Sequence, residues 1–117
     1  MLKFVATFTY SSASWARMLK VEEDRAAAVG ALLEHFGGSL ESIYWDVRTA
    51  SAHITADLPD SVSATAVIIA AAKTGAFKDV NVHEVLSQDQ LSDMIALTRS
   101  SEGVYLPPGA AAAEQDV

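Results

Sequence analysis

The sequence predicts an α+β domain in which two interlocked βαβ units form a four-stranded antiparallel sheet with helices on one face. The main evidence is the spacing of residues that end and begin helices. Gly37-Gly38 ends one helical pattern, Pro59-Asp60 begins a second, and Gly75 ends that one. Glycine adopts the left-handed conformation that closes helices, and proline stops a strand. Together with alternating segments around them, these residues divide the first ~90 positions into strand, helix, strand, strand, helix and strand.

The composition favours one domain with its own core. The chain has 117 residues, and 50% of them are hydrophobic, which is enough to bury a core. Its formal charge is −7, from 8 basic and 15 acidic residues. Nucleic acids and anionic membranes attract basic surfaces, so we expect neither as a partner. Cysteine is absent, which excludes disulfides, thiolate nucleophiles and zinc–cysteine sites, and we expect no cofactor.

We expect neither a signal peptide nor a membrane-spanning segment. Residues 1–10 alternate between apolar and polar side chains, unlike a signal peptide. The apolar run 66–72 is far shorter than the ~20 residues that span a bilayer. We therefore expect a soluble cytoplasmic protein.

The first strand is predicted at residues 2–10, where apolar side chains alternate with a period of two. Its even-numbered residues form the expected core side. Residues 11–20 are less regular. We expect only a short helical turn there, with Trp15, Met18 and Leu19 against the core.

The first main helix is predicted at about 21–36. The acidic residues 22–24 are expected in its first turn, where the helix dipole favours negative charge, and Gly37 is expected just beyond its end. A single apolar stripe with spacing i, i+3, i+4 and i+7 supports the helix and consists of Val29, Leu32, Leu33 and Phe36.

Two further strands, at 39–46 and 50–58, are separated by a short link that favours a hairpin. Asp60 is a suitable N-cap for a helix at about 61–74. That helix is apolar almost all round, so we expect it to be packed on more than one side. The fourth strand is predicted at 77–86.

A third helix is predicted at 88–99. Ser87 and Gln90 have the spacing of a capping box, in which each side chain bonds the other's backbone. We therefore assign residues 1–99 to the domain. Residues 100–117 are expected to form an extended or disordered tail, or a segment docked on a neighbour.

Polar side chains gather on the face of the sheet that the helices leave open. In the strand order usual for this topology, the first strand lies between the fourth and the third. Alternation then brings His53, His83, Asp57, Asn81 and Thr7 to one face. A histidine near a carboxylate can act as a general base or bind a metal weakly. The simpler interpretation is a polar sheet face that is wet or covered by a second subunit.

Trp45 is the remaining candidate, because tryptophan favours amphipathic sites at the edge of a sheet. No metal site is predicted, since the histidines lack the close spacing typical of zinc ligands. The candidate catalytic residues are His53 and His83, and the candidate ligand-binding residues are Trp45, Asp57, Asn81 and Thr7.

The chain resembles the GYD domain family, small bacterial and archaeal proteins of poorly defined function. The matching features, in order, are Phe8-Thr9-Tyr10, Arg25, Phe36-Gly37-Gly38, Ile43-Tyr44-Trp45, Leu58-Pro59-Asp60, Gly75 and Tyr105-Leu106-Pro107-Pro108-Gly109. The resemblance implies a ferredoxin-like βαββαβ sandwich, here with an extra carboxyl-terminal helix. It also implies a likeness to dimeric α+β barrel proteins, which pair their sheets.

The sequence departs from the family at the motif that gives it its name. Counting back from Pro59-Asp60, the Gly, Tyr and Asp fall on Arg48, Ala50 and Ser51. Any role that those three residues play in relatives cannot be transferred to this chain.

Three classes of function are open. The first is a structural or regulatory domain that self-associates, as a homodimer or larger oligomer. The second is a module that binds a small organic molecule. The third is a cofactor-free enzyme of the dimeric barrel type, an isomerase, cyclase or monooxygenase-like protein, with His53 or His83 as general base. A cavity containing His53 would favour the last two, and a sheet face filled by a partner would favour the first.

Overall fold

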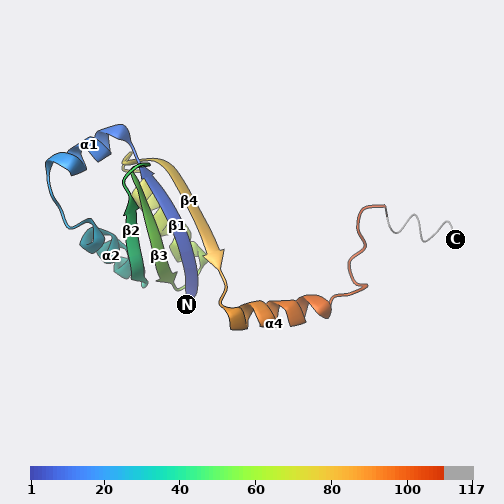
Figure 1. Cartoon of the computed structure of the whole chain (residues 1–117). Coiled ribbons are helices and arrows are strands. Elements are labelled where there is room, and N and C mark those ends of the chain that lie inside the picture. The colour runs from blue at the N-terminus through green and yellow to red at the C-terminus, as the bar shows by residue number, and fades with distance from the viewer. Residues whose placement is uncertain (110–117) are drawn as a thin grey trace. The chain divides into compact units, whose positions relative to one another are not determined.

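The computed structural model describes residues 1–109. Its elements are β1 (Leu2–Tyr10), α1 (Ser12–Lys20), α2 (Arg25–His35), β2 (Ser39–Asp46), β3 (Ser51–Leu58), α3 (Ser61–Ala72), β4 (Phe77–Val85) and α4 (Gln88–Arg99) (Figure 1). The chain divides into two compact units, Met1–Val85 and the part that begins at Leu86. Each unit is described by itself. None of the described helices is long and apolar enough to cross a membrane.

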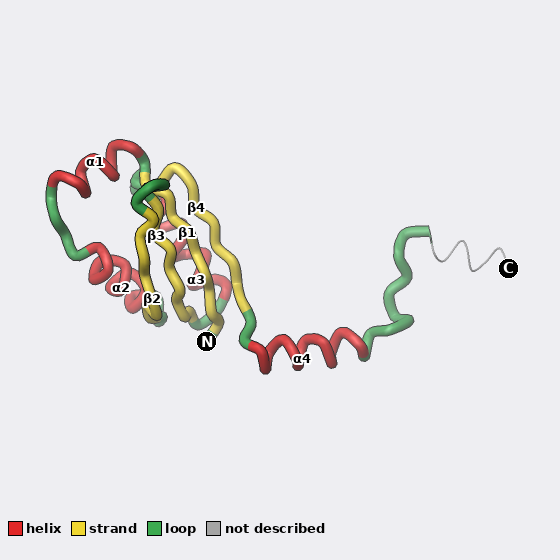
Figure 2. The backbone as a smooth tube through the Cα atoms, in the orientation of Figure 1, coloured by secondary structure: helices red, strands yellow, loops and turns green. Residues whose placement is uncertain are grey.

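The first unit is a four-stranded antiparallel sheet with the order β2-β3-β1-β4 (Figure 2). This order confirms the predicted one. The two βαβ units interlock because β1 lies beside both β3 and β4. The architecture is the ferredoxin-like α+β fold.

The core lies between one face of the sheet and helices α2 and α3. Alternate residues of β1 and β3 are buried there, as their period of two predicts. Leu33 of α2 and Val67 of α3 pack against them. Aromatic contacts close one end, where the ring of Phe77 lies 5.1 Å from that of Phe8 and 5.0 Å from that of Tyr10.

Segment 11–24 differs from the prediction. A nine-residue helix, α1, replaces the short turn, and its N-cap Ser11 accepts a hydrogen bond from the Ser14 backbone N–H. Helix α2 begins at Arg25, not near residue 21, because Asp24 acts as its N-cap and accepts from the Ala27 N–H. The acidic residues 22–24 therefore precede the helix and are not in its first turn.

Helix α3 ends at Ala72, two residues before the predicted end, and one side of it is exposed within the described chain. Ala64 and Val67 are buried, but Val62 is 80% exposed and Ile69 58% exposed. Packing on more than one side was therefore wrong for the described chain. Its N-cap is Asp60, as predicted, and accepts from the Ser63 N–H at 2.7 Å.

The turn from α2 into β2 depends on glycine. Gly37 has φ +81°, and the Gly38 N–H donates to the Leu33 carbonyl at 2.9 Å. A Cβ on Gly38 would lie 2.2 Å from the Asp57 carbonyl oxygen, so β2 starts in direct backbone contact with β3. Only glycine permits this close approach.

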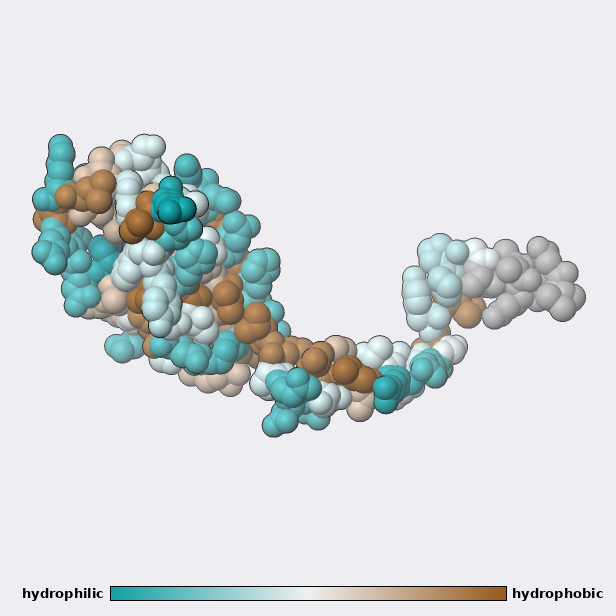
Figure 3. Space-filling view, viewed as in Figure 1, coloured by the Kyte–Doolittle hydropathy of each residue, from teal (hydrophilic) through white to brown (hydrophobic). Residues whose placement is uncertain are grey.

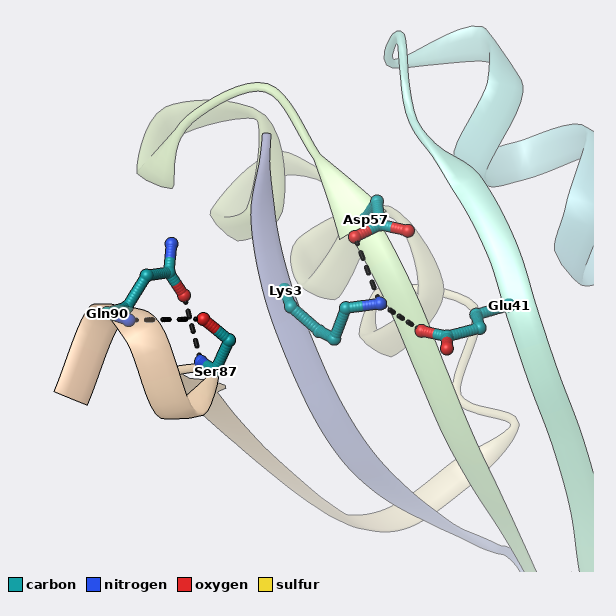
Figure 4. A network of polar contacts seen from close by, with 5 residues as sticks. All are labelled: Lys3, Glu41, Asp57, Ser87 and Gln90. Atoms are coloured by element: carbon teal, nitrogen blue, oxygen red, sulfur yellow. Dashed lines mark hydrogen bonds and ion pairs between the residues drawn. The ribbon is translucent and has the colours of Figure 1, made fainter. Parts of the chain in front are cut away.

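The second unit contains α4, whose bounds match the prediction. Ser87 accepts from the Gln90 N–H at 3.2 Å, and Gln90 Oε1 accepts from the Ser87 N–H at 2.9 Å, which confirms the capping box (Figure 4). Hydrophobic side chains gather along this helix (Figure 3). Turns follow it, with Val104 N–H donating to the Ser101 carbonyl. Residues 110–117, the end of the expected tail, lie outside the described residues.

Candidate functional site

The open face of the sheet carries the polar residues that alternation placed there. Residues directly opposite one another in an antiparallel pair share a face, so the strand registers define its members. They are Lys3, Val5, Thr7 and Thr9 of β1, Ser51, His53, Thr55 and Asp57 of β3, Asp79, Asn81, His83 and Val85 of β4, and Ser39, Ser42, Tyr44 and Asp46 of β2.

The two histidines occupy different rows of this face. His53 lies opposite Thr7, whose hydroxyl is 3.3 Å from its Nδ1, whereas His83 lies opposite Val5. Two strand spacings of ~4.8 Å and a two-residue step along the strand separate their Cα atoms by roughly 12 Å. Both histidines are exposed. Among residues 1–109, no three His, Cys, Asp or Glu side chains cluster as metal ligands do.

The other candidates of this face make separate contacts. Asp57 pairs with Lys3 at 3.4 Å, and Lys3 also bonds Glu41 (Figure 4). The hydrogen bond to Glu41 raises the pKa of Lys3 above its usual value. Asn81 donates to Asp79 at 3.1 Å. Asp57 is therefore engaged by an ammonium group rather than orienting either histidine.

Trp45 lies on the other face of the sheet. Its register partner is Ala52, whose side chain is in the core, and Trp45 itself is 36% exposed at the edge strand β2. Its neighbour Tyr44 lies opposite His53 on the open face and is 71% exposed. The structure thus does not bring Trp45 together with the five candidates of the open face. The roles assigned to all six residues stay predictions.

The described chain also has an apolar hollow that the sequence did not reveal. It encloses about 280 Å³ between the core face of the sheet and helices α2 and α3. Its walls include the alanines of β1 and β3 and of α3, and the aromatic rings of Phe4, Phe8 and Phe77. The alanines that line it are Ala6, Ala28, Ala52, Ala56, Ala64, Ala70, Ala71 and Ala76.

These alanines are the one feature of the sequence that could have indicated the hollow. Ala6, Ala52 and Ala56 occupy core positions at which strands commonly carry larger β-branched residues. Alternation identified the face on which they lie, but it does not measure how completely small side chains fill the space beneath two helices.

A second hollow of about 320 Å³ lies beside α1 and the segment that leads into α2. It is lined by Tyr10, Ser14, Arg17, Met18, Lys20, Val21, Glu23, Arg25 and Ala76. Tyr10, Arg25 and Ala76 also line the apolar hollow, so the two spaces share a wall. Neither hollow includes any of the six candidate residues predicted from the sequence.

The family model of the GYD domain matches residues 4–95, which is most of the chain. The chain belongs to the GYD domain family. No curated protein matches its sequence. A solved structure, an uncharacterized NIPSNAP domain protein from Burkholderia xenovorans, is similar over 74% of this chain and 94% of that one, with a TM-score of 0.46 and 11% identity.

The β2–β3 hairpin contains Arg48, Ala50 and Ser51, the positions at which the sequence led us to expect the family's Gly-Tyr-Asp motif. Asp46 Oδ1 accepts from the backbone N–H groups of Arg48 and Thr49, and these hydrogen bonds hold the pKa of Asp46 below its usual value. Ala50 has φ +55°, a conformation that favours glycine. Ser51 is buried, and its hydroxyl bonds that of Thr9 at 2.8 Å. A serine hydroxyl is thus anchored within the sheet at the start of β3.

Proposed function

We propose that this GYD domain binds a small, largely apolar organic molecule in the hollow beneath α2 and α3. The observation that carries the proposal is an apolar space of about 280 Å³ inside a unit of 85 residues, Met1–Val85. Binding sites for small molecules are concave, mostly apolar and at least about this large. At ~30 Å³ per water-sized group, the hollow accommodates on the order of ten non-hydrogen atoms.

The energetic cost of an empty space of this size supports an occupant. At about 24 cal/mol per Å³, a sealed void of about 280 Å³ would cost about 7 kcal/mol. That is comparable to the whole stability of a typical domain, about 5–15 kcal/mol. The cost is smaller for a hollow that communicates with solvent, but an apolar ligand would still recover part of it.

A titration with 2-phenylethanol, a neutral molecule of suitable size, tests this proposal. Backbone amide NMR shifts should change for residues that line the hollow, with saturation. Ala71→Leu adds three carbon atoms at a lining position of α3, and Ala72→Leu makes the same change at an exposed neighbour outside the lining. We expect Ala71→Leu to weaken binding at least tenfold and Ala72→Leu to leave it unchanged. Equal binding by both variants, or no saturable binding by the parent, would contradict the proposal.

We also propose that the open face of the sheet pairs with a second copy of the chain. The support is exposed apolar and aromatic surface on a mostly polar face: Val5 on the central strand β1 is 38% exposed, and Tyr44 on the edge strand β2 is 71% exposed. Such exposed surface gains free energy when a partner covers it. Because the hollow lies on the opposite face of the sheet, a pairing of this kind would leave the ligand site unobstructed.

A further inference from the structure

The polar hollow beside α1 is continuous in its lining with the apolar one. Tyr10, Arg25 and Ala76 contribute to both. One side of this shared wall is almost wholly apolar, and the other collects charged side chains from α1 and from the segment before α2. A ligand that follows the wall would meet an apolar surface at one end and a charged one at the other.

The charge at the polar end is positive, in contrast to the chain as a whole. Arg17, Lys20 and Arg25 line it, three of only 8 basic residues in a chain of net charge −7. Glu23 is the only carboxylate residue in its lining. Ser14, 6% exposed, accepts a hydrogen bond from Arg17 Nη2 at 3.1 Å and so holds that guanidinium beside the hollow. Within residues 1–109, neither Arg17 nor Lys20 forms a salt bridge.

Tyr10 offers a hydrogen-bond donor at the junction. It is 4% exposed, and its hydroxyl makes no hydrogen bond to another described residue. No side-chain polar atom of the described part of the chain is both fully enclosed and without a partner. The hydroxyl oxygen therefore keeps some accessible surface, and Tyr10 lines the two hollows. A buried phenol without a protein partner is a donor available to a ligand.

We propose that the ligand is a small organic acid, whose apolar body fills the hollow beneath α2 and α3 and whose carboxylate lies at Arg25, Arg17 and Tyr10. This inference rests on the proposed function and adds the chemical class of the ligand. Guanidinium groups bind carboxylates through paired, charge-assisted hydrogen bonds. Arg17 has no carboxylate partner within residues 1–109, so a neutral ligand would leave its charge without an anion.

The negative charge of Glu23 is unfavourable for a bound carboxylate but does not prevent binding. Its Oε2 lies 3.4 Å from Arg25 Nη1, and the Glu23 side chain is 57% exposed. Exposed pairs at this distance contribute little and exchange readily with water or a competing anion. A ligand carboxylate would compete with Glu23 for the same guanidinium, so removal of the Glu23 charge should strengthen binding of the acid.

The experiment compares phenylacetate with 2-phenylethanol at pH 7, two probes with the same skeleton and different head groups. Dissociation constants are measured by calorimetry or NMR titration on the full chain. We expect phenylacetate to bind about tenfold more tightly, the effect of one hydrogen-bonded charge pair. Arg25→Gln and Arg17→Gln should each reduce that preference severalfold, Tyr10→Phe should reduce it less, and Glu23→Gln should increase it. Arg48→Gln, outside both linings, is the matched control and should change nothing.

The outcomes separate this inference from the function on which it rests. Equal affinity of the parent for acid and alcohol would overturn the acid assignment and leave a neutral apolar ligand. A preference for the acid that survives both arginine substitutions would overturn the assigned head-group site. Saturable binding of neither probe would overturn the proposed function itself. Retained binding of 2-phenylethanol by each arginine variant shows that the variant is folded.

Discussion

Gly38→Ala is expected to destabilise the first unit more than any other single methyl addition at a glycine of the described chain. The new Cβ would lie 2.2 Å from the Asp57 carbonyl oxygen and 2.7 Å from Leu58 Cδ2. The leucine side chain could rotate away, but the carbonyl belongs to β3, which is hydrogen-bonded to strands on both sides. The backbone at residue 38 must therefore move instead.

The magnitude follows from two contributions. Inserting a methyl group into a close-packed site costs about 1–3 kcal/mol. Displacing the turn also strains the Gly38 N–H bond to the Leu33 carbonyl, 2.9 Å in the native structure, which is worth about 1 kcal/mol. We expect a loss of about 3 kcal/mol in the free energy of unfolding, or a fall of about 12–24 °C in Tm.

The assay is urea unfolding followed by far-UV circular dichroism, with Gly30→Ala as the matched control. Gly30 is inside α2, and a Cβ added there would meet no atom within 4 Å. The control should be neutral or more stable by about 0.5–1 kcal/mol, because alanine favours a helix. A Gly38→Ala midpoint within about 0.5 kcal/mol of the parent would refute the close-approach argument. Failure of both variants to fold would refute it as well, since Gly30 has no clash.

Three further results are expected. Hydrogen bonds from Ser63 lower the pKa of Asp60 in the folded state. The stabilisation that the Asp60 carboxylate provides is therefore complete above its unfolded-state pKa, near 3.9, and is lost as the pH falls through its lower folded-state pKa. The Tm difference between the parent and Asp60→Ala should therefore be largest at neutral pH and vanish in strong acid, and a pH-independent difference would contradict this. Ser87→Ala should lower the helicity of residues 88–99, as measured by Cα chemical shifts, because it removes a helix cap worth about 1 kcal/mol. Unchanged Cα shifts would contradict this. Tyr44→Lys should reduce the mass measured by light scattering at micromolar concentration, whereas Val47→Lys in the adjacent turn should not; a parent that is only a 12.4 kDa species would exclude the pairing.

Regular patterns made most of the fold predictable. Alternation along β1 identified its buried face, and the Ser87–Gln90 spacing located the start of α4. Both signals are local, because a period of two or a capping box depends on neighbouring residues alone. The strand order needed only the rule that two interlocked βαβ units place the first strand between the third and the fourth.

Segment 11–24 was less predictable because its local signals compete. Helix α1 packs Trp15 and Met18 against the core, as expected, but Leu19 is 71% exposed, so its apolar stripe is only two residues wide and is too short to predict a full helix. Its one clear mark is Ser11, whose side chain caps the helix. Before α2, the charge of residues 22–24 suits the first turn of a helix, but Asp24 also suits the N-cap position, and the structure uses it there.

That same segment supplies the polar half of the proposed ligand site. Arg17 and Lys20 belong to the last turns of α1, and Glu23 lies in the link to α2. Alternation placed the polar residues of the strands, but that rule does not apply to the charged residues of a short helix. Sites of this kind are expected where sequence rules describe the chain least well. The apolar half of the site could not be predicted from the sequence for a different reason. Alanine fits the hydrophobic pattern of a core position, but its small side chain does not fill the space there.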